Sequence, residues 1–418
     1  MFWLVENKEQ FQEFLGRGFN EAFVEIIPNN PWQHPSQNSI CAFYIRHIED
    51  TKGFILPVSH TETGSLFEDE IYLYLKRLKK IYVRDKKEFL HYTTLKQLID
   101  ITLTLPPYIL PITTAHKFLY ERYPNLLTIN QLVPITKHYE VCEQVYDDLE
   151  HRINSALNPF YNDMATLVFN AIERNGIKIN KDEFNKHFPE TQEDFVYTQY
   201  NFKTLTTRPS NRFGGINFAA LPHDSGVRKA FIPRNDVFVE IDISAYHPTL
   251  AATLVGYDFG DTDVHSSFAE MYKTDYKTAK ELTFKQLYGG VFDNYKDLPF
   301  FKLTSEYIRT TWETFQTTGS ITCPISNHVF ELDKLENMNP QKLFNYILQN
   351  LETSLNIEIL YRILKILKDK NTKLVLYTYD SFLFDLDNNE QEVLNEIKKV
   401  FDKLKLHTKI KNGYNYDF

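Results

Sequence analysis

Cysteine and glycine are scarce in this chain of 418 residues, and long apolar runs are missing. Its three cysteines, Cys41, Cys142 and Cys323, match neither a zinc-ligand spacing nor a disulfide framework, which favours a reducing cytoplasm. With only 14 glycines, collagen-like architecture and glycine-rich linkers are excluded. No segment approaches the ~20 apolar residues of a membrane span, and Glu6 and Lys8 interrupt the stretch where a signal peptide would be apolar. We therefore expect a soluble, cytoplasmic protein with no membrane partner.

Positive net charge is also missing. The chain has 46 Lys and Arg against 55 Asp and Glu, a net charge of −9, which by itself argues against nucleic-acid binding. Hydrophobic residues at 43% and aromatic residues at 15% exclude a disordered chain. The basic residues are concentrated in residues 206–234, which hold five basic side chains and one acidic one: Arg208, Arg212, Arg228, Lys229 and Arg234 against Asp224. A segment that can bind phosphates therefore lies within an acidic chain.

The N-terminal 148 residues alternate between strand-like and helix-like patterns, which predicts an α/β domain. Strands are expected within 23–27, 40–45 and 53–58, and helices at 68–79, 92–102 and 138–150. A further helix is expected from Asn158 to Asn175, with Pro159 in its first turn and Gly176 at its end.

Two aspartates stand where strands are expected to end. Residues 237–244 alternate as a strand that ends at Asp242, and a helix should follow Ser244 and end at Gly256. Residues 374–385 predict a hairpin with Asp380 at its turn. Either aspartate alone is usually a cap or turn residue. Brought together, the two carboxylates would repel each other unless cations neutralise them, as in a two-metal phosphoryl-transfer site.

A helix is expected at residues 277–290. At about 100° per residue, four side chains fall within an arc of roughly 80°: Lys277, Lys280, Phe284 and Tyr288. Two cations followed by two aromatic rings suit a nucleoside triphosphate. The alternative is a half-buried helix whose lysine stems cover apolar surface.

Taken in order, these segments resemble the family A DNA polymerases, the bacterial DNA polymerase I type. Asp242 lies in a segment similar to motif A, residues 280–289 resemble motif B, and residues 379–381 resemble motif C. Further similarity lies in the segment before motif A, at the start of the fingers, and on the helix before motif C: residues 206–210, 217–222, 227–231 and 263–265, with Asn345 and Gln349. The resemblance extends over residues 164–418.

The resemblance implies an α+β right-hand polymerase of compact, phage-like form, with an antiparallel palm sheet, helical fingers and a much reduced thumb, preceded by an α/β ribonuclease H-like domain. Its implied boundaries are 1–148 for a degenerate 3′–5′ exonuclease-like domain, 149–200 for a helical linker or vestigial thumb, 201–265 and 326–418 for the palm, and 266–325 for the fingers. It implies template-directed DNA synthesis from dNTPs on a primer–template, with low processivity unless another replisome protein replaces the thumb. The composition suits a phage or mobile element, which places the protein in the host cytoplasm. An RNA polymerase or reverse transcriptase of the same superfamily, and a catalytically weak replisome scaffold, stay open.

Residue roles follow from the same resemblance. Asp242 and Asp380 would be catalytic and, with the Ile243 carbonyl, would hold two Mg²⁺ ions, for which Mn²⁺ can substitute. The expected nucleotide-binding residues are Lys277, Lys280, Phe284, Tyr288, His247 and Tyr246. The expected DNA-binding residues are Arg208, Asn217, Arg228, Asn345 and Gln349.

Three positions depart from the family pattern. Tyr276 stands in place of the first motif B arginine, so we expect Lys277 to take over its role at the triphosphate. Ser381 replaces the usual motif C glutamate. His247 matches the motif A glutamate that excludes a ribose 2′-hydroxyl, and because an imidazole can fill that space, preference for dNTPs is expected.

The acidic pattern of the exonuclease is eroded. The first strand should carry Asp-x-Glu, but it reads Glu25-Ile26-Ile27, and Ile27 cannot ligate a metal. The acidic residues that remain as a vestigial exonuclease site are Glu25, Asp85, Glu88, Asp100 and Glu143. We expect no 3′–5′ exonuclease activity, and a structural or DNA-guiding role for this domain.

Overall fold

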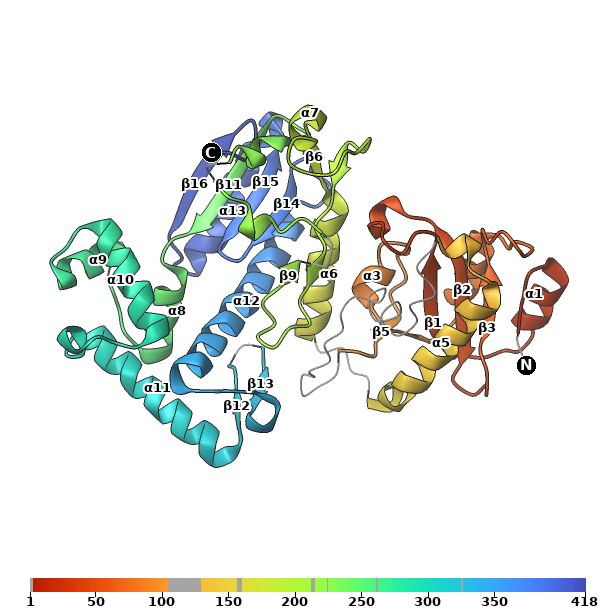
Figure 1. Ribbon diagram of the computed structural model, residues 1–418, viewed down its shortest axis with the longest axis horizontal. Coiled ribbons are helices and arrows are strands. Elements are labelled where there is room, and N and C mark those ends of the chain that lie inside the picture. Colours follow the sequence, from red (N-terminus) through yellow and green to blue (C-terminus); the bar gives the residue numbers. More distant parts are fainter. Residues whose placement is uncertain are drawn as a thin grey trace. The chain divides into compact units, whose positions relative to one another are not determined.

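The computed structural model describes residues 3–103, 129–155, 160–211, 215–223, 225–260, 262–324 and 326–418 (Figure 1). The chain forms two compact units. The N-terminal unit comprises Met1–Arg174, Gln199–Asn201 and Asn211–Gly215, and the C-terminal unit comprises Asn175–Thr198, Phe202–Ser210 and Ile216–Phe418. The first unit thus extends beyond residue 148. The expected α+β class is confirmed. Among the described residues, no helix is both long and apolar enough to span a membrane.

The N-terminal unit is built on a five-stranded mixed sheet in the order β3-β2-β1-β4-β5. Its strands are β1 (Glu21–Pro28), β2 (Ile40–His47), β3 (Phe54–Pro57), β4 (Lys80–Val83) and β5 (Leu98–Asp100). Strand β2 is antiparallel to both β1 and β3, whereas β4 runs parallel to β1 and β5 runs parallel to β4. The strands predicted at 23–27, 40–45 and 53–58 are confirmed.

Helices cover both faces of this sheet. The helices are α1 (Lys8–Leu15), α2 (Glu68–Leu75), α3 (Lys86–Phe89) and α5 (Ile135–Leu149). Phe11 of α1 and Leu75 of α2 pack against one face, and Val145 of α5 packs against the other. Figure 1 shows α5 crossing the sheet. Because each strand buries side chains on both faces, the strand sequences read as nearly continuous apolar runs.

The prediction of a helix at residues 92–102 is wrong. Its apolar residues recur at spacings that suit a helix, but Leu98–Asp100 forms strand β5, whose Leu98 pairs with Ile81 of β4. The Asp100 carboxylate then accepts hydrogen bonds from the backbone N–H groups of Lys86 and Thr102 at 2.9 Å each. Pairing with a distant strand thus outweighs the local pattern.

The C-terminal unit contains a four-stranded antiparallel sheet in the order β14-β15-β11-β16. Its strands are β11 (Val237–Ile243), β14 (Lys373–Thr378), β15 (Ser381–Leu386) and β16 (Thr408–Gly413). Helices α12 (Pro340–Ile366) and α13 (Glu392–Lys403) pack against it. Phe401 of α13 contacts Phe382 with ring centroids 5.2 Å apart, and Asn356 of α12 donates to the Tyr377 hydroxyl. The strand predicted at 237–244 and the hairpin predicted at 374–385 are confirmed.

A helical region follows β11 in the chain. It comprises α8 (Tyr246–Val255), α9 (Val264–Tyr272), α10 (Tyr276–Gly289) and α11 (Pro299–Thr318), followed by strands β12 (Ser320–Thr322) and β13 (Val329–Glu331). The Asp263 and Asp275 carboxylates cap α9 and α10 by accepting from backbone N–H groups in the first turn. Phe268 and Phe301 pack between α9 and α11. The helices predicted after Ser244 and at 277–290 are confirmed.

Further helices and strands lie among the described residues. They are α6 (Phe160–Asn175), β6 (Ile177–Ile179), α7 (Lys181–Phe184), β7 (Phe195–Val196), β8 (Tyr200–Asn201), β9 (Ser210–Asn211) and β10 (Phe231–Ile232). Helix α6 ends as predicted at Gly176, whose φ of 63° favours glycine. Its expected first residues, Asn158 and Pro159, lie outside the described residues, as do Arg212 and Asp224 of the basic segment.

Candidate active site

One cavity of the C-terminal unit contains most of the predicted metal- and nucleotide-binding residues. The predicted residues that line it are Asp242, Ile243, Asp380, Tyr246, His247, Lys280, Phe284, Tyr288 and Arg208. The other lining residues are Ser244, Ala245, His265, Glu352 and Lys409. Lys277 is exposed and does not line the cavity, although it lies on the same helix, α10.

The two aspartates come from adjacent strands. Asp242, near the end of β11, pairs with Ser381 of β15, which directly follows Asp380 in the chain. The Ile243 N–H donates to the Asp380 carbonyl at 2.8 Å, which ties the hairpin turn to β11. Burial and the charge of Asp242 raise the pKa of Asp380 to about 6. Burial and Glu240 also raise the pKa of Asp242, although Lys280 opposes this. A bound cation would favour both charged forms.

The turn that carries Asp380 is held in an unfavourable backbone conformation. Tyr379 has a φ of 59°, in the left-handed region that costs a non-glycine residue on the order of 1 kcal/mol. The Arg208 guanidinium lies 3.6 Å from the centroid of the Tyr379 ring. Asn356, which is fully buried, donates to the Tyr379 carbonyl at 2.6 Å. These contacts fix the backbone beside Asp380. Asn356 also accepts from the Tyr246 hydroxyl at 2.9 Å, so Tyr246 is linked to the residue that holds the turn.

His247 is the centre of a buried polar network. Its Nε2 lies 3.0 Å from Glu352 Oε2, and its Nδ1 lies 2.5 Å from the Tyr288 hydroxyl. Arg208 Nε lies 3.2 Å from the same Glu352 oxygen. Glu352 is only 2% exposed, so the carboxylate is stabilised by these two partners. No local sequence signal marks Glu352, because it lies in the middle of the long helix α12.

A further carboxylate, that of Glu240, lies beside the two aspartates. Glu240 is two residues before Asp242 on β11, and so lies on the same face of the strand. Its carboxylate accepts from the Ser381 hydroxyl at 2.7 Å. Glu240 thus places a carboxylate next to Ser381, the residue at which the sequence analysis expected a glutamate.

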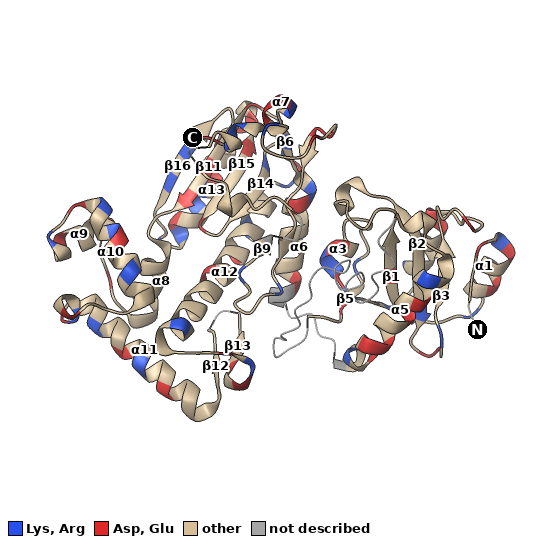
Figure 2. Ribbon diagram, viewed as in Figure 1, with Lys and Arg blue, Asp and Glu red and all other residues tan. Residues whose placement is uncertain are grey.

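The cavity also contains cations from two elements. Lys280 comes from α10 and Lys409 comes from the edge strand β16. Figure 2 shows basic residues along β16 and on α10. Burial, followed by the charge of Lys280, lowers the pKa of the adjacent His265, which favours a neutral imidazole.

The predicted DNA-binding residues occupy different settings. Gln349 donates to Asn345 at 3.2 Å and accepts from the Thr206 hydroxyl at 3.1 Å, so this pair on α12 is linked to the basic segment. Asn217 is exposed. Arg228 is only 8% exposed, because its guanidinium donates to the Leu221 carbonyl and lies 4.7 Å from the centroid of the Tyr416 ring.

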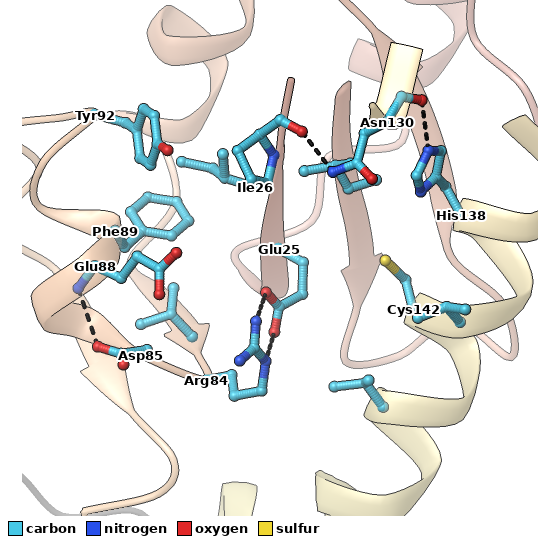
Figure 3. Close-up of a pocket in the computed structure, with 15 residues that line it drawn as sticks. Glu25, Ile26, Arg84, Asp85, Glu88, Phe89, Tyr92, Asn130, His138 and Cys142 are labelled. Atoms are coloured by element: carbon cyan, nitrogen blue, oxygen red, sulfur yellow. Dashed lines mark hydrogen bonds and ion pairs between the residues drawn. The ribbon is translucent and has the colours of Figure 1, made fainter. Parts of the chain in front are cut away.

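The five residues predicted as a vestigial exonuclease site are separated in the N-terminal unit. Glu25, Asp85 and Glu88 line one pocket, whereas Asp100 and Glu143 do not (Figure 3). Arg84 binds Glu25 through two hydrogen bonds of 2.8 and 2.9 Å, and this buried guanidinium is the counter-ion of that carboxylate. The Asp85 side chain accepts from the Glu88 N–H and caps α3.

The other two carboxylates have structural partners. Asp100 accepts from backbone N–H groups, as described above. The Glu143 carboxylate accepts from the Tyr44 hydroxyl and from the Gly53 N–H, each at 2.6 Å, and from Arg46 at 3.3 Å. These contacts fix α5 against the sheet.

A further cluster of possible metal ligands lies in the same unit: His34, His91 and Glu173. Lys87 Nζ, however, lies 2.7 and 2.9 Å from the two Glu173 oxygens. Burial would raise the pKa of Glu173, but Lys87 and His91 lower it to about 2. A lysine ammonium therefore already neutralises this carboxylate.

Comparison with known proteins supports the fold. No protein-family model and no curated protein sequence matches the chain. A solved structure of the POL domain of Pol1 from M. smegmatis, in complex with DNA primer-template and dNTP, is similar with a TM-score of 0.70. The similarity covers 99% of this chain and 99% of that chain at 13% sequence identity. The chain therefore has a fold like that of a DNA polymerase POL domain.

Proposed function

We propose that this protein is a template-directed DNA polymerase of the family A type, which adds dNTPs to a primer 3′ end. The observation that carries the proposal is the single cavity in which Asp242 and Asp380 lie with the α10 side chains Lys280, Phe284 and Tyr288. A nuclease also needs paired carboxylates, but it does not need this stripe of one cation and two rings.

The residues of the cavity fit two Mg²⁺ ions, because two half-buried carboxylates with raised pKa values are stabilised by a hard cation. The ions, or Mn²⁺ in their place, would be held by Asp242, Asp380 and the Ile243 carbonyl, and would supply charge stabilisation to phosphoryl transfer.

The protein side chains bind and orient the substrates of the proposed reaction. The primer 3′-hydroxyl attacks the α-phosphate of the dNTP, and pyrophosphate leaves. Lys280 binds the phosphates, while Phe284 and Tyr288 contact the base and sugar. Their rings are stacked at a centroid distance of 6.0 Å, which leaves one continuous aromatic surface along α10.

The primer–template is proposed to lie along Arg208, Asn345 and Gln349. The strand order of the N-terminal unit, with its antiparallel and parallel pairs, supports a ribonuclease H-like domain that has lost its metal site. We further propose a role in replication of a phage or mobile element, with low intrinsic processivity. A processivity factor or other replisome protein would replace the reduced thumb.

Primer extension tests the proposed function. With Mg²⁺ and a DNA template, the wild-type protein should extend a DNA primer with dNTPs in the order that the template dictates. Parallel reactions with an RNA template and with rNTPs separate the alternatives. Faster synthesis on RNA would favour a reverse transcriptase, and faster synthesis from rNTPs an RNA polymerase. Absence of synthesis under all these conditions would favour a scaffold.

The exonuclease prediction has its own measurement. A primer with a mismatched 3′ end, incubated with protein and Mg²⁺ but without dNTPs, should remain intact. The reason is that the Arg84 guanidinium neutralises Glu25 and binds both carboxylate oxygens, in place of a metal ion. Restoring one carboxylate by Ile27→Glu should not create activity while Arg84 is present. Release of mononucleotides by the wild-type protein would contradict this prediction.

A further inference from the structure

The geometry assigns Lys409 of β16 as a second lysine that binds the triphosphate of the incoming nucleotide. This is the role that the sequence suggested for Lys277. This inference rests on the proposed polymerase function and names a further nucleotide-binding residue for it. Lys409 is far from every motif that the sequence analysis selected, since it lies in the last strand of the chain.

The pairing of β16 with β11 places Lys409 at the carboxylates. Lys409 is the cross-strand partner of Asp242, and Lys411 is the partner of Glu240. Directly paired residues on neighbouring antiparallel strands project from the same face of the sheet, about 5 Å apart. Lys409 therefore projects from the face that carries Asp242, and it lines the same cavity. Lys411 is exposed and does not line the cavity.

Tyr276 holds the Lys409 ammonium beside α10. Lys409 Nζ lies 3.3 Å from the Tyr276 hydroxyl and 5.5 Å from the centroid of the Tyr276 ring. Tyr276 also contacts His265, with ring centroids 5.6 Å apart. Tyr276 is the residue that replaces the first motif B arginine. Tyr276 thus carries no charge itself but binds the Lys409 ammonium from β16.

Two cations from different elements suit the charge of a triphosphate. Lys280 approaches from α10, four residues before Phe284, and Lys409 approaches from the sheet. An ammonium on a four-carbon stem can reach phosphate oxygens as a compact charge, without the planar geometry that an arginine needs. Lys277 has no comparable position, since it lies outside the cavity.

The test compares single-nucleotide incorporation by Lys409→Ala, Lys409→Arg and two lysine controls, Lys277→Ala and Lys411→Ala. Lys409→Ala should raise the KM for the dNTP at least tenfold and weaken inhibition by pyrophosphate in parallel, with a smaller change in kcat. Lys409→Arg should restore most of the affinity. Both controls should stay within twofold of the wild type. Thermal unfolding of each variant checks that the fold is kept.

Three results would overturn the inference. One is an unchanged KM in Lys409→Ala, and another is an equal loss in Lys277→Ala. The third is a fall in kcat at constant KM, which would show that Lys409 acts on Asp242 instead of on the phosphates. Equilibrium binding of dATP without DNA separates this inference from the proposed function. If the wild type binds dATP but extends no primer, and Lys409→Ala loses that binding, the polymerase proposal fails while Lys409 remains a triphosphate ligand.

Discussion

Replacing Asp380 by asparagine should reduce primer extension by at least about 1,000-fold, because an amide cannot supply the negative charge that holds a divalent cation for phosphoryl transfer. The same loss is expected for Asp242→Asn. Single-turnover extension with Mg²⁺ measures the effect. Since Tyr379, Arg208 and Asn356 fix the backbone of the turn independently of the carboxylate, the loss should occur in a folded protein.

The same substitution should stabilise the metal-free protein. Burial and Asp242 raise the pKa of Asp380 to about 6 in the folded state, above its unfolded value. The group therefore contributes stability that is present below pH 4 and is lost as the pH rises through about 6. Without metal, Asp380→Asn should exceed the wild type in free energy of unfolding by up to about 3 kcal/mol at pH 7.5, and by little at pH 4. Urea unfolding of the whole protein in EDTA, with the transition of the C-terminal unit as the readout, measures this difference.

Asp385 provides a matched control on the same strand. Its carboxylate is also buried, but it accepts from the backbone N–H groups of Arg234 and Asn235, at 2.7 and 2.9 Å, away from the cavity. Asp385→Asn should therefore retain synthesis at a temperature where the variant is folded. Wild-type extension rates in Asp380→Asn would contradict the two-metal proposal.

The parts of the cavity that could be predicted from the sequence are those with a local signal. Asp242 and Asp380 stand at the ends of apolar strand patterns, and Phe284 and Tyr288 recur at helical spacing on α10. Each of these signals depends on a segment of about a dozen residues. The structure confirms the strand, the hairpin and the helix that carry them.

The remaining parts depend on contacts between distant segments. Glu352 and Asn356 lie within the apolar sequence of α12, and only its packing against β14 and α8 brings them to Tyr379 and His247. The helix predicted over strand β5 is wrong for the same reason, because pairing with β4 outweighs the helical spacing of its apolar residues. Lys409 could not be selected before the pairing of β16 with β11 was known.

His247→Ala should reduce the preference for dNTPs over rNTPs by about 100-fold, equivalent to about 2.7 kcal/mol of discrimination. The imidazole is fixed from both sides. Its Nε2 is hydrogen-bonded to Glu352 and its Nδ1 is hydrogen-bonded to the Tyr288 hydroxyl. Such a ring cannot move aside for a ribose 2′-hydroxyl, whereas an alanine would leave space for it. Single-nucleotide incorporation of dATP and ATP opposite the same template base measures the ratio.

Substitutions at Glu352 and Tyr246 test whether discrimination requires the His247 imidazole to be held in place or only to be large. Glu352→Ala keeps the imidazole but removes the partner of Nε2, so it should lose part of the discrimination, with an effect between those of the wild type and His247→Ala. Tyr246→Phe removes only the hydroxyl that donates to the fully buried Asn356, and should keep the wild-type ratio. A wild-type protein that incorporates ATP as fast as dATP would contradict the role of His247. If Glu352→Ala retained full discrimination, the size of the imidazole alone would account for it.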